Sequence, residues 1–595
     1  MNMMTRRGAT PPEAKLAMPE QRFDRGRLRA HPAAPGLVAR RAGVVGGTTG
    51  LTGFAGWEMA AALGSDGWQG PDFLALPIFL VLFARLALSA CSFVAGMLHR
   101  PAPPLHAGPL RSRTALLFPM HNEETARVFG TADAMREALL ARGIAAHFDI
   151  FLLSDSTDPA RQAREAEAAR RLSLLHAGGV FYRRRPANAG RKAGNIADWV
   201  RRHGGAYEHF VILDADSVMA AATLHRLAAA MEADARAGLI QTLPTLVGGT
   251  TLFARMQQWA ARMHGPGIAR GLAAWHGEAG NYWGHNAIIR TRAFAEAAGL
   301  PNLPGRKPFG GEIMSHDFVE AALLRRAGWG VHLWSEPSGS HESGPPTLGA
   351  AVLRDRRWCQ GNLQHAALLG AAGLHPLSRL HLLDGILAYA ASPLWLLLLG
   401  TAALQAAFGL AQAGPGLLAL TMALLLLPKL QGLREPANAL REFGLTTLLA
   451  PLGMVTQTRQ ILDILSGRDS GWAAQGREAA MPSWRQALRE HAPHMATGAA
   501  LLLPSLVAPA ALPWLLPVSL PLLTAPALAR FVARPFPGAA FRTQEEAHPS
   551  PLLRRAATLR RAWQLELREA PALGLPASPR PAPAIAVEQQ EALAA

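Results

Sequence analysis

Long apolar stretches occupy both ends of the chain and leave a polar middle. Two of them come first, at Gly43–Leu63 and Phe73–Leu98, and each is long enough to cross a bilayer as a helix. Five more follow Leu380, at Gly385–Leu410, Gly416–Leu433, Phe443–Leu465, Ala496–Leu512 and Pro513–Phe531. The pattern predicts a transmembrane hairpin, then a polar domain, and then a transmembrane bundle.

The polar middle, from about Arg111 to Leu380, contains no apolar run of membrane-spanning length. Short apolar segments alternate there with Ala/Arg/Leu-rich stretches such as Asp158–His176 and Ala220–Ala237, which we expect to be helices. The apolar segments, which we expect to be strands, include Ala115–Phe118, Phe148–Leu153, Phe210–Leu213 and Ala287–Ile289. This alternation predicts an α/β domain with a largely parallel sheet, in which catalytic residues gather at the carboxyl ends of strands.

Positive charge is concentrated beside the apolar stretches. Residues 1–41 hold nine Lys and Arg against three Asp and Glu, whereas the linker between the first two stretches holds Asp66 and Asp72 and no Lys or Arg. Because cytoplasmic flanks of membrane spans are rich in Lys and Arg, we expect both flanks of the hairpin in the cytoplasm and the linker outside. The formal charge of +17 therefore reflects topology, and since no nucleic-acid recognition module accompanies it, no nucleic-acid partner is expected.

One of the later stretches is expected to lie along the membrane surface. If Phe443–Leu465 crossed the bilayer, the arginine-rich segment 468–489 would face the periplasm, against the charge rule. We therefore expect an interfacial helix there, six spans in the whole chain, and both termini in the cytoplasm. From about Pro571 the chain is rich in Pro and Ala, which predicts a partly disordered tail.

Composition agrees with a membrane protein. Half of the residues are hydrophobic and only 17% are charged, which is unusual for a soluble enzyme. The two cysteines, Cys91 and Cys359, imply no disulfide framework. The predicted parts are a basic cytoplasmic N-terminal segment (1–41), a transmembrane hairpin (42–98), a cytoplasmic catalytic domain (99–380), a transmembrane bundle with the interfacial helix and a polar loop (381–533), and a cytoplasmic tail (534–595).

Two of the predicted strands end in acidic residues. Phe148–Leu153 leads into Asp155, and Phe210–Leu213 leads directly into Asp214 and, two residues on, Asp216. Two carboxylates at that spacing can share a hard divalent cation and leave open positions for phosphate oxygens. Alone this pattern is weak evidence, because aspartates are also common in turns and helix caps.

Further polar motifs surround these carboxylates in the sequence. They are Phe118–Glu124, Asn188–Asn195, Tyr282–Arg290, Ser315–Asp317 and Arg354–Trp358, the last followed by Cys359–Asn362. In this order they resemble the motifs of processive family 2 glycosyltransferases, which have a GT-A fold with a mixed, mostly parallel sheet. With the two preceding spans, the set looks like the glucans biosynthesis glucosyltransferase H family, and the resemblance covers roughly residues 40–535.

The resemblance implies roles on the side of the sugar donor, UDP-glucose. The uridine pocket would be lined by Pro119, His121, Asn122, Glu123 and Asp155. Lys192 would offer its ammonium to the diphosphate. Asp214 and Asp216 would hold Mg²⁺ (or Mn²⁺) there, which neutralises the charge that develops on the UDP leaving group.

The resemblance also implies a general base. Asp317 stands where the family places it, although the triplet here is Ser-His-Asp instead of Thr-Glu-Asp. An inverting transfer needs one carboxylate on the acceptor side, which takes the proton of the attacking hydroxyl. The alternative is an N-cap aspartate for a helix over Phe318–Arg326.

Acceptor binding is implied by a variant of the Gln-x-x-Arg-Trp motif of cellulose and chitin synthases. Arg357 and Trp358 are retained and would bind the end of the growing glucan chain, with the indole packed on a pyranose. Arg354 replaces the glutamine, so it has either an acceptor-binding or a purely structural role. The polar loop Ser466–Arg477 has a position similar to the gating loop of cellulose synthase, where Arg468 or Arg477 could contact phosphate; a static linker is the alternative.

The resemblance finally implies a product and a place in the cell. The product would be the β-1,2-linked backbone of osmoregulated periplasmic glucans, made at the bacterial inner membrane and passed to periplasmic glucan-processing proteins. Another β-linked polymer, such as cellulose or chitin, is the alternative product. A transporter or a catalytically silent scaffold is the alternative class of protein, and the retained carboxylates argue against both.

Overall fold

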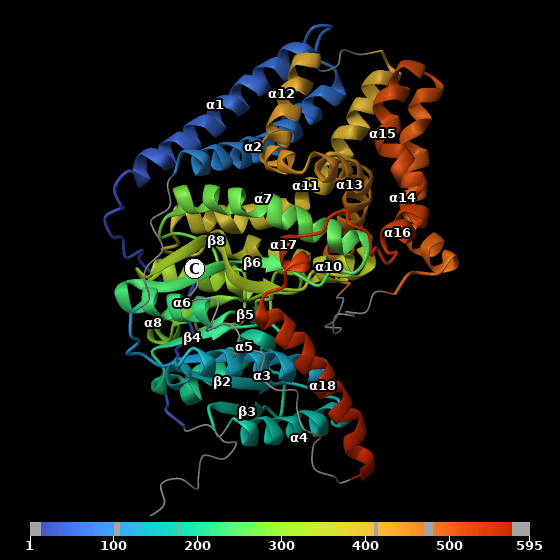
Figure 1. Cartoon of the computed structure of the whole chain (residues 1–595). Coiled ribbons are helices and arrows are strands. Elements are labelled where there is room, and N and C mark those ends of the chain that lie inside the picture. Colours follow the sequence, from blue (N-terminus) through green and yellow to red (C-terminus); the bar gives the residue numbers. More distant parts are fainter. Residues whose placement is uncertain (1–12, 100–107, 177, 410–413, 469–479, 574–595) are drawn as a thin grey trace, which may run out of the picture.

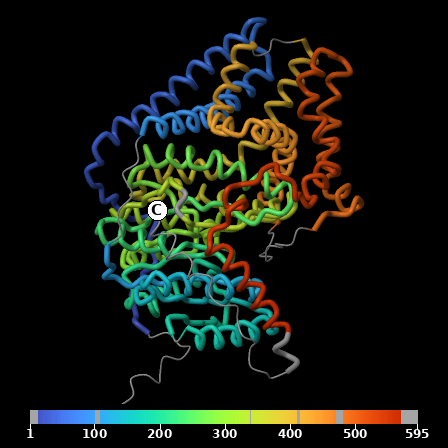
Figure 2. Tube along the Cα trace, viewed as in Figure 1, coloured from blue at the N-terminus to red at the C-terminus, as the bar shows by residue number. Residues whose placement is uncertain are grey.

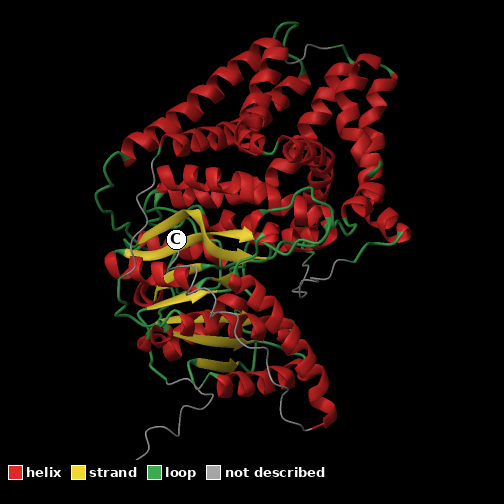
Figure 3. Ribbon diagram, in the orientation of Figure 1, coloured by secondary structure: helices red, strands yellow, loops and turns green. Residues whose placement is uncertain are grey.

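The computed structural model describes residues 13–99, 108–176, 178–409, 414–468 and 480–573. Figure 1 shows one part built from strands and helices and another part built from helices alone. Figure 3 makes the same division visible, because the strands are confined to one side of helix α7 (Leu252–His276). The polar middle of the sequence forms the α/β part, and the apolar stretches form the helical part.

The α/β part contains one eight-stranded sheet with the strand order β3-β2-β1-β4-β7-β6-β8-β5. Four neighbouring pairs are parallel and three are antiparallel, so the sheet is mixed and mostly parallel, as the sequence predicts. The strands are β1 (Thr114–Met120), β2 (Phe148–Ser154), β3 (Val180–Arg184), β4 (His209–Ile212), β5 (Val218–Met219), β6 (Ala237–Leu246), β7 (Ala287–Arg290) and β8 (Gly330–Glu342).

Helices cover both faces of this sheet. On β2, Leu152 points into a core that includes Phe129 of α3 (Thr125–Ala141), whereas Phe151 points to the other face and packs near Trp199 of α5 (Arg191–His203). This alternation follows from the two-residue repeat of a strand. The other helices of the α/β part are α4 (Pro159–Leu175), α6 (Ala221–Ala233), α8 (Thr291–Ala297), α9 (His316–Arg326) and α10 (Leu348–Gln364).

Strand direction brings the motifs to one edge of the sheet. β1, β2 and β4 are parallel, so their carboxyl ends lie together. β7 is antiparallel to β4, which places the segment before β7 beside the carboxyl end of β4. β6 is antiparallel to β7 and parallel to β8, so the carboxyl end of β8 reaches the same edge.

The helical part contains the predicted spans. Its helices are α1 (Leu37–Leu63), α2 (Gly70–Leu98), α11 (Pro376–Ala407), α12 (Pro415–Leu426) with its continuation η4 (Leu427–Arg434), α13 (Pro436–Leu465), α14 (Trp484–Leu502), α15 (Leu512–Leu523) and α16 (Ala525–Val532). Length and hydropathy qualify three of the described helices as spans: Gly70–Leu98, Pro376–Ala407 and Pro415–Arg434. A fourth is added if Pro509–Leu523 and Ala525–Val532, bent by 61°, form one span. α1 and α14 fall outside this set, so the count of six remains a prediction.

Helix α7 joins the two parts. It lies between the sheet and the apolar helices (Figure 1), and it touches α2 at two glycines. A Cβ atom added to Gly96 would lie only 2.4 Å from the backbone nitrogen of Gly271. Two helices can approach this closely only where small residues meet.

The N-terminal segment lies on the α/β part as an extended strap, which we define as residues 13–34. Its backbone exchanges hydrogen bonds with the end of α5, where Ala14 N donates to Arg202 O (2.8 Å) and Ala14 O accepts from Gly205 N (2.9 Å). Further along, Phe23 O accepts from Ala372 N (2.8 Å). The predicted basic segment is therefore packed against the predicted catalytic domain.

The C-terminal segment also returns to the α/β part. Helix α18 (Pro551–Leu573) runs beside α3, which is far away in the sequence but adjacent in Figure 2. Trp563 of α18 is fully buried and donates a hydrogen bond to Asp133 (3.0 Å), and Arg555 binds both carboxylate oxygens of Glu137 (2.6 and 2.8 Å). The sequence predicts a tail here without predicting this docked helix, and most of the tail after Pro571 lies outside the described residues.

Candidate active site

The loop after β1 is joined to the end of β2. His121 Nδ1 lies 2.9 Å from the backbone oxygen of Asp155. Asn122 adopts a left-handed conformation (φ 55°), which asparagine tolerates better than most residues. Its Oδ1 accepts hydrogen bonds from the backbone nitrogens of Thr157 (3.0 Å) and Asp158 (3.2 Å). These contacts hold His121 and Asn122 against the segment that begins at Asp155, while Pro119 lies on β1 and Glu123 follows Asn122 in the chain.

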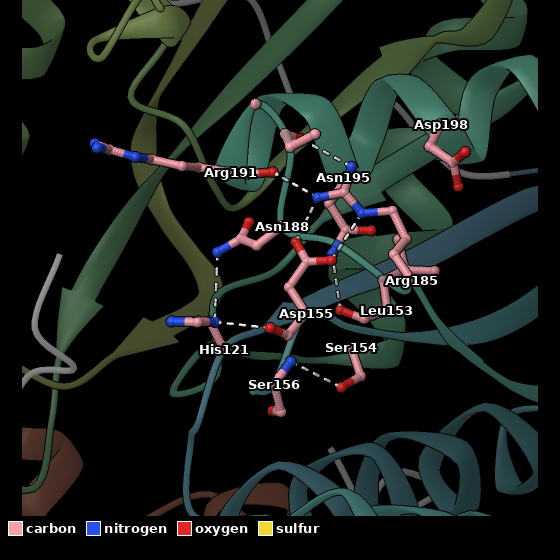
Figure 4. A network of polar contacts seen from close by, with 12 residues as sticks. His121, Leu153, Ser154, Asp155, Ser156, Arg185, Asn188, Arg191, Asn195 and Asp198 are labelled. Carbon is pink, nitrogen blue, oxygen red and sulfur yellow. Dashed lines mark hydrogen bonds and ion pairs between the residues drawn. The ribbon is translucent and has the colours of Figure 1, made fainter. Parts of the chain in front are cut away.

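Asp155 is almost fully buried and pairs with an arginine that the sequence motifs do not include. Its two oxygens accept from Arg185 Nε (2.7 Å) and Nη2 (2.6 Å), and Figure 4 shows the two side chains facing each other. Arg185 also donates to the backbone oxygens of Ala189 (2.9 Å) and Arg191 (3.2 Å). It therefore fixes the loop that begins α5. No sequence signal separates Arg185 from the neighbouring Arg183 and Arg184.

Lys192 connects two strands at the centre of the site. Its Nζ pairs with the Asp214 carboxylate, and it donates a hydrogen bond to the backbone oxygen of Gly284 (2.8 Å). Asp214 follows β4 and Gly284 precedes β7, so the antiparallel pairing of these strands creates the contact. The ammonium group neutralises one of the two motif carboxylates after β4.

Asp317 stands on the other side of Gly284. This glycine has a φ of +86°, and a Cβ atom added to it would lie 3.2 Å from Asp317 Oδ2. The positive φ favours glycine at this position, and a larger residue would also press against the Asp317 carboxylate. The N-cap residue of α9 is Ser315, and Asp317 lies in the first turn, so the sequence alternative in which Asp317 caps this helix does not describe the structure. A negative charge in a first turn is favoured by the helix dipole.

A second pair of ionisable groups lies beside Asp214 and Asp216. His285 Nε2 is 3.2 Å from Glu342 Oε2 at the end of β8. Burial lowers the pKa of His285, whereas the negative charges of Glu342, Asp214 and Asp216 raise it. The effect of these charges is the larger one, so the net shift of the pKa is upward. Burial raises the pKa of Glu342, and Asp216 and Asp214 add to this effect against the opposing charge of His285. His285 and Glu342 therefore interact electrostatically with Asp214 and Asp216.

This charge distribution suits a divalent cation bound together with an anionic ligand. The Asp214 side chain is 39% exposed, so its carboxylate is open to the site. Across the described ranges, no group of three or more His, Cys, Asp or Glu side chains is arranged to hold a metal ion. Two carboxylates supply part of an octahedral Mg²⁺ shell, whose other positions are commonly filled by water and phosphate oxygens. The residues present fit an ion of this kind.

The acceptor motif lies on α10 and faces the same site. Burial lowers the pKa of Arg357, whereas the charges of Asp214 and Glu123 oppose this effect, so Arg357 lies within electrostatic reach of both carboxylates. The Arg354 guanidinium lies 4.4 Å from the ring centroid of Trp358, which is 47% exposed. Arg354, Arg357 and Trp358 therefore share one helix, and the two arginines interact electrostatically with the acidic residues after β4.

The beginning of the polar loop is anchored to α10. Arg356 donates to the backbone oxygens of Gln460 (3.1 Å) and Arg468 (2.7 Å), although the motif gives Arg356 no role. The Arg468 side chain is exposed and pairs with Asp463 (3.2 Å). Arg477 lies outside the described residues. The structure thus ties α13 to the α/β part and places Arg468 at the surface of this junction.

Comparisons with known proteins agree with the motifs. The family model "Glycosyl transferase family 2" matches residues 117–297, and "Glycosyl transferase family group 2" matches residues 209–430. Among solved structures, the chain is similar to a mannosyltransferase from Pyrobaculum calidifontis in complex with GDP-Man and Mn²⁺. That similarity has a TM-score of 0.42 at 17% sequence identity, and it covers 67% of this chain and 99% of the other.

Curated relatives match nearly the whole chain. Glucans biosynthesis glucosyltransferase H from Xanthomonas oryzae pv. oryzae is 43% identical over 93% of this chain and 95% of its own length. The proteins of that name from a Shewanella species and from Rhodopseudomonas palustris are 42% and 44% identical, each over 95% of this chain and over 84% and 88% of their own lengths. The chain therefore belongs to the glucans biosynthesis glucosyltransferase H family of family 2 glycosyltransferases.

Proposed function

We propose that this enzyme transfers glucose from UDP-glucose to a growing glucan with inversion at the anomeric carbon, and that it builds the β-1,2-linked backbone of osmoregulated periplasmic glucans. One structural observation supports this proposal most directly. Lys192 joins Asp214 to the backbone of Gly284, and Asp317 stands against the same glycine. Asp214, proposed to act on the sugar donor, and Asp317, proposed to act on the acceptor, therefore both lie next to the loop that contains Gly284.

The donor half of the site would hold UDP-glucose through its uridine and its diphosphate. The loop fixed by Asn122, with the buried pair of Asp155 and Arg185, would orient the uridine. Lys192 would contact the diphosphate. Mg²⁺ or Mn²⁺, held by Asp214 and Asp216, would supply positive charge to the UDP leaving group.

The acceptor half would activate and orient one hydroxyl of the glucan. Asp317 would take the proton of that hydroxyl as its oxygen bonds to the anomeric carbon. The bond from that carbon to the UDP oxygen breaks at the same time, and its electron pair leaves with UDP. Attack from the face opposite UDP converts the α-linked donor into a β-linked product. The exposed face of Trp358, held by the stacked Arg354, would bind the terminal glucose ring.

A panel of sugar donors tests this assignment. The full chain, purified in detergent, would be supplied with Mg²⁺ and in turn with UDP-glucose, UDP-galactose and UDP-N-acetylglucosamine. We expect kcat/KM for UDP release to be highest with UDP-glucose, by about tenfold or more, because buried polar groups left unpaired by the wrong sugar raise the barrier. Preference for UDP-N-acetylglucosamine would contradict the assignment and favour a chitin-type product.

Placement of both chain ends supports an even number of membrane crossings on either side of the catalytic domain. The strap and α18 both pack on the α/β part, so the chain must return to the same side of the membrane before each contact. α13 is bonded to α10 through Arg356, which supports an interfacial position. We propose a multi-pass protein of the bacterial inner membrane with six spans and cytoplasmic termini, which delivers glucan to periplasmic processing proteins.

Reporter tags test this topology. Tags after Met1, near Arg477 and after Ala595 should report the cytoplasm, whereas tags near Asp66 and Gly414 should report the periplasm. The expectation follows from the contacts of the strap and α18 with the catalytic domain. A periplasmic signal near Arg477 would mean that α13 crosses the membrane and that six is the wrong count.

A further inference from the structure

Two cavities adjoin where α2, α7 and η4 meet. One has a volume of about 600 Å³ and the other of about 540 Å³. Three residues line both of them: Arg270 of α7, and Gln431 and Arg434 of η4. The two cavities therefore form one continuous site with arginines at the junction, and none of Asp155, Asp214, Asp216 and Asp317 lines it.

The smaller cavity is largely apolar and lies at the ends of two candidate membrane spans. Its apolar lining comes from Phe93 and Met97 of α2 and from Leu427, Leu430 and Leu433 of η4. Gly70–Leu98 and Pro415–Arg434 are both apolar and long enough to span a bilayer, and these residues lie at the ends that lead toward the α/β part. Met97, Leu430 and Leu433 are between 54% and 68% exposed, as expected for side chains that face lipid.

The positive charge at the junction comes from Arg270 and Arg434. Among the described residues, neither Arg270 nor Arg434 has a salt-bridge partner, whereas Arg262 in the larger cavity pairs with Glu545 (2.9 Å). Two carboxylates, Glu336 and Glu435, line the larger cavity only, and Glu435 already accepts a hydrogen bond from Trp259 (2.7 Å). The junction therefore offers two guanidinium groups beside an apolar cavity.

We propose that Arg270 and Arg434 bind the phosphate of an anionic phospholipid from the cytoplasmic leaflet, and that its acyl chains occupy the apolar cavity. Guanidinium groups bind phosphate through paired, charge-assisted hydrogen bonds, and basic pockets beside membrane helices suit anionic headgroups. This inference rests on the membrane placement proposed above but not on the identity of the sugar donor. A lipid in this position would contact both α7 and α2 and would stabilise their packing; α7 in turn packs against the sheet.

Lipid binding to the detergent-purified full chain tests the inference without using turnover. Native mass spectrometry would count bound lipid during titration with phosphatidylglycerol, with phosphatidylcholine, and with inorganic phosphate added as a competitor. We expect wild-type protein to retain phosphatidylglycerol, with an affinity about tenfold or more above that for phosphatidylcholine. The Arg270→Gln/Arg434→Gln variant should lose this preference. A matched control, Arg485→Gln/Arg489→Gln, removes the same charge from exposed residues of α14 and should keep it.

Each outcome of the lipid-binding experiment either supports or contradicts a phospholipid site at Arg270 and Arg434. Unchanged selectivity in the Arg270→Gln/Arg434→Gln variant, or equal retention of both lipids by wild-type protein, would overturn the proposal. Displacement of phosphatidylglycerol by millimolar inorganic phosphate would assign the arginines to a free anion instead. If the double variant does not fold, the exposed Arg434→Gln alone should still weaken retention, and wild-type affinity in that variant would also overturn the proposal.

Discussion

Replacing Asp317 with asparagine should abolish glucosyl transfer and leave binding of UDP-glucose and Mg²⁺ almost unchanged. The substitution removes the group that would accept the hydroxyl proton, and loss of a general base typically lowers the rate about 10²–10⁴-fold. The sugar donor would meet Lys192, Asp214 and Asp216, which keep their own contacts. Turnover would be followed by UDP release, and donor binding by calorimetry in detergent.

Folding must be checked separately, because Asp317 lies in the first turn of α9. Loss of its charge there should lower stability by only about 0.3–1 kcal/mol. Asp234→Asn provides a matched control, since this aspartate accepts a hydrogen bond from Arg236 N (2.9 Å) at the end of α6 and asparagine can do the same. The control should retain turnover. Near-normal turnover of Asp317→Asn would reject it as the base, and joint loss of turnover and UDP binding would indicate a role on the donor side.

Replacing Asp216 with asparagine should remove most activity by a different route. A neutral amide is a poorer ligand for a hard divalent cation than a carboxylate is, so binding of UDP with Mg²⁺ should weaken about tenfold or more. Binding of UDP in the presence of a chelator should not change. Asp216 stands two residues after Asp214, at the edge of the sheet where the carboxyl end of β4 meets the segment before β7, and this placement is the structural reason for the expectation.

The metal titration distinguishes this role from a structural one. A variant that has lost a metal ligand should require more Mg²⁺ for half-maximal activity, while its thermal unfolding without metal stays near that of the wild type. Wild-type turnover with unchanged metal dependence would remove Asp216 from the metal site. An unfolded variant would be replaced by Asp216→Glu, which keeps a carboxylate and should retain metal-dependent UDP binding.

The local sequence pattern predicted the strands that precede the acidic motifs, but it did not predict β3 and β8. Phe148–Leu153 and Phe210–Leu213 are uninterrupted apolar runs, and both lie in buried strands near the expected positions. β3 (Val180–Arg184) contains two arginines, and β8 (Gly330–Glu342) is rich in polar residues, so neither resembles a core strand. Their pairing with neighbouring strands decides their structure, and such pairing is invisible to a local pattern.

The motifs indicated candidate site residues, but not the side chains that position them. The contact of Asp155 with Arg185 and that of His285 with Glu342 join segments that no motif connects. Docking of α18 through Trp563 depends on a partner, Asp133, that is distant in the sequence. These contacts arise from tertiary packing, so the sequence shows the reactive groups more clearly than the residues that position them.

Analysis of the product made from UDP-glucose tests the central claim most directly. The purified chain would be incubated with UDP-glucose and Mg²⁺, and its polymer would be examined by methylation analysis for linkage and by NMR for anomeric configuration. We expect 2-linked glucosyl residues in the β configuration, because inversion of the α-linked donor gives a β bond and the proposed product is a β-1,2-linked backbone. A 4-linked polymer would favour a cellulose-type synthase, and an α-linked product would contradict the inverting mechanism.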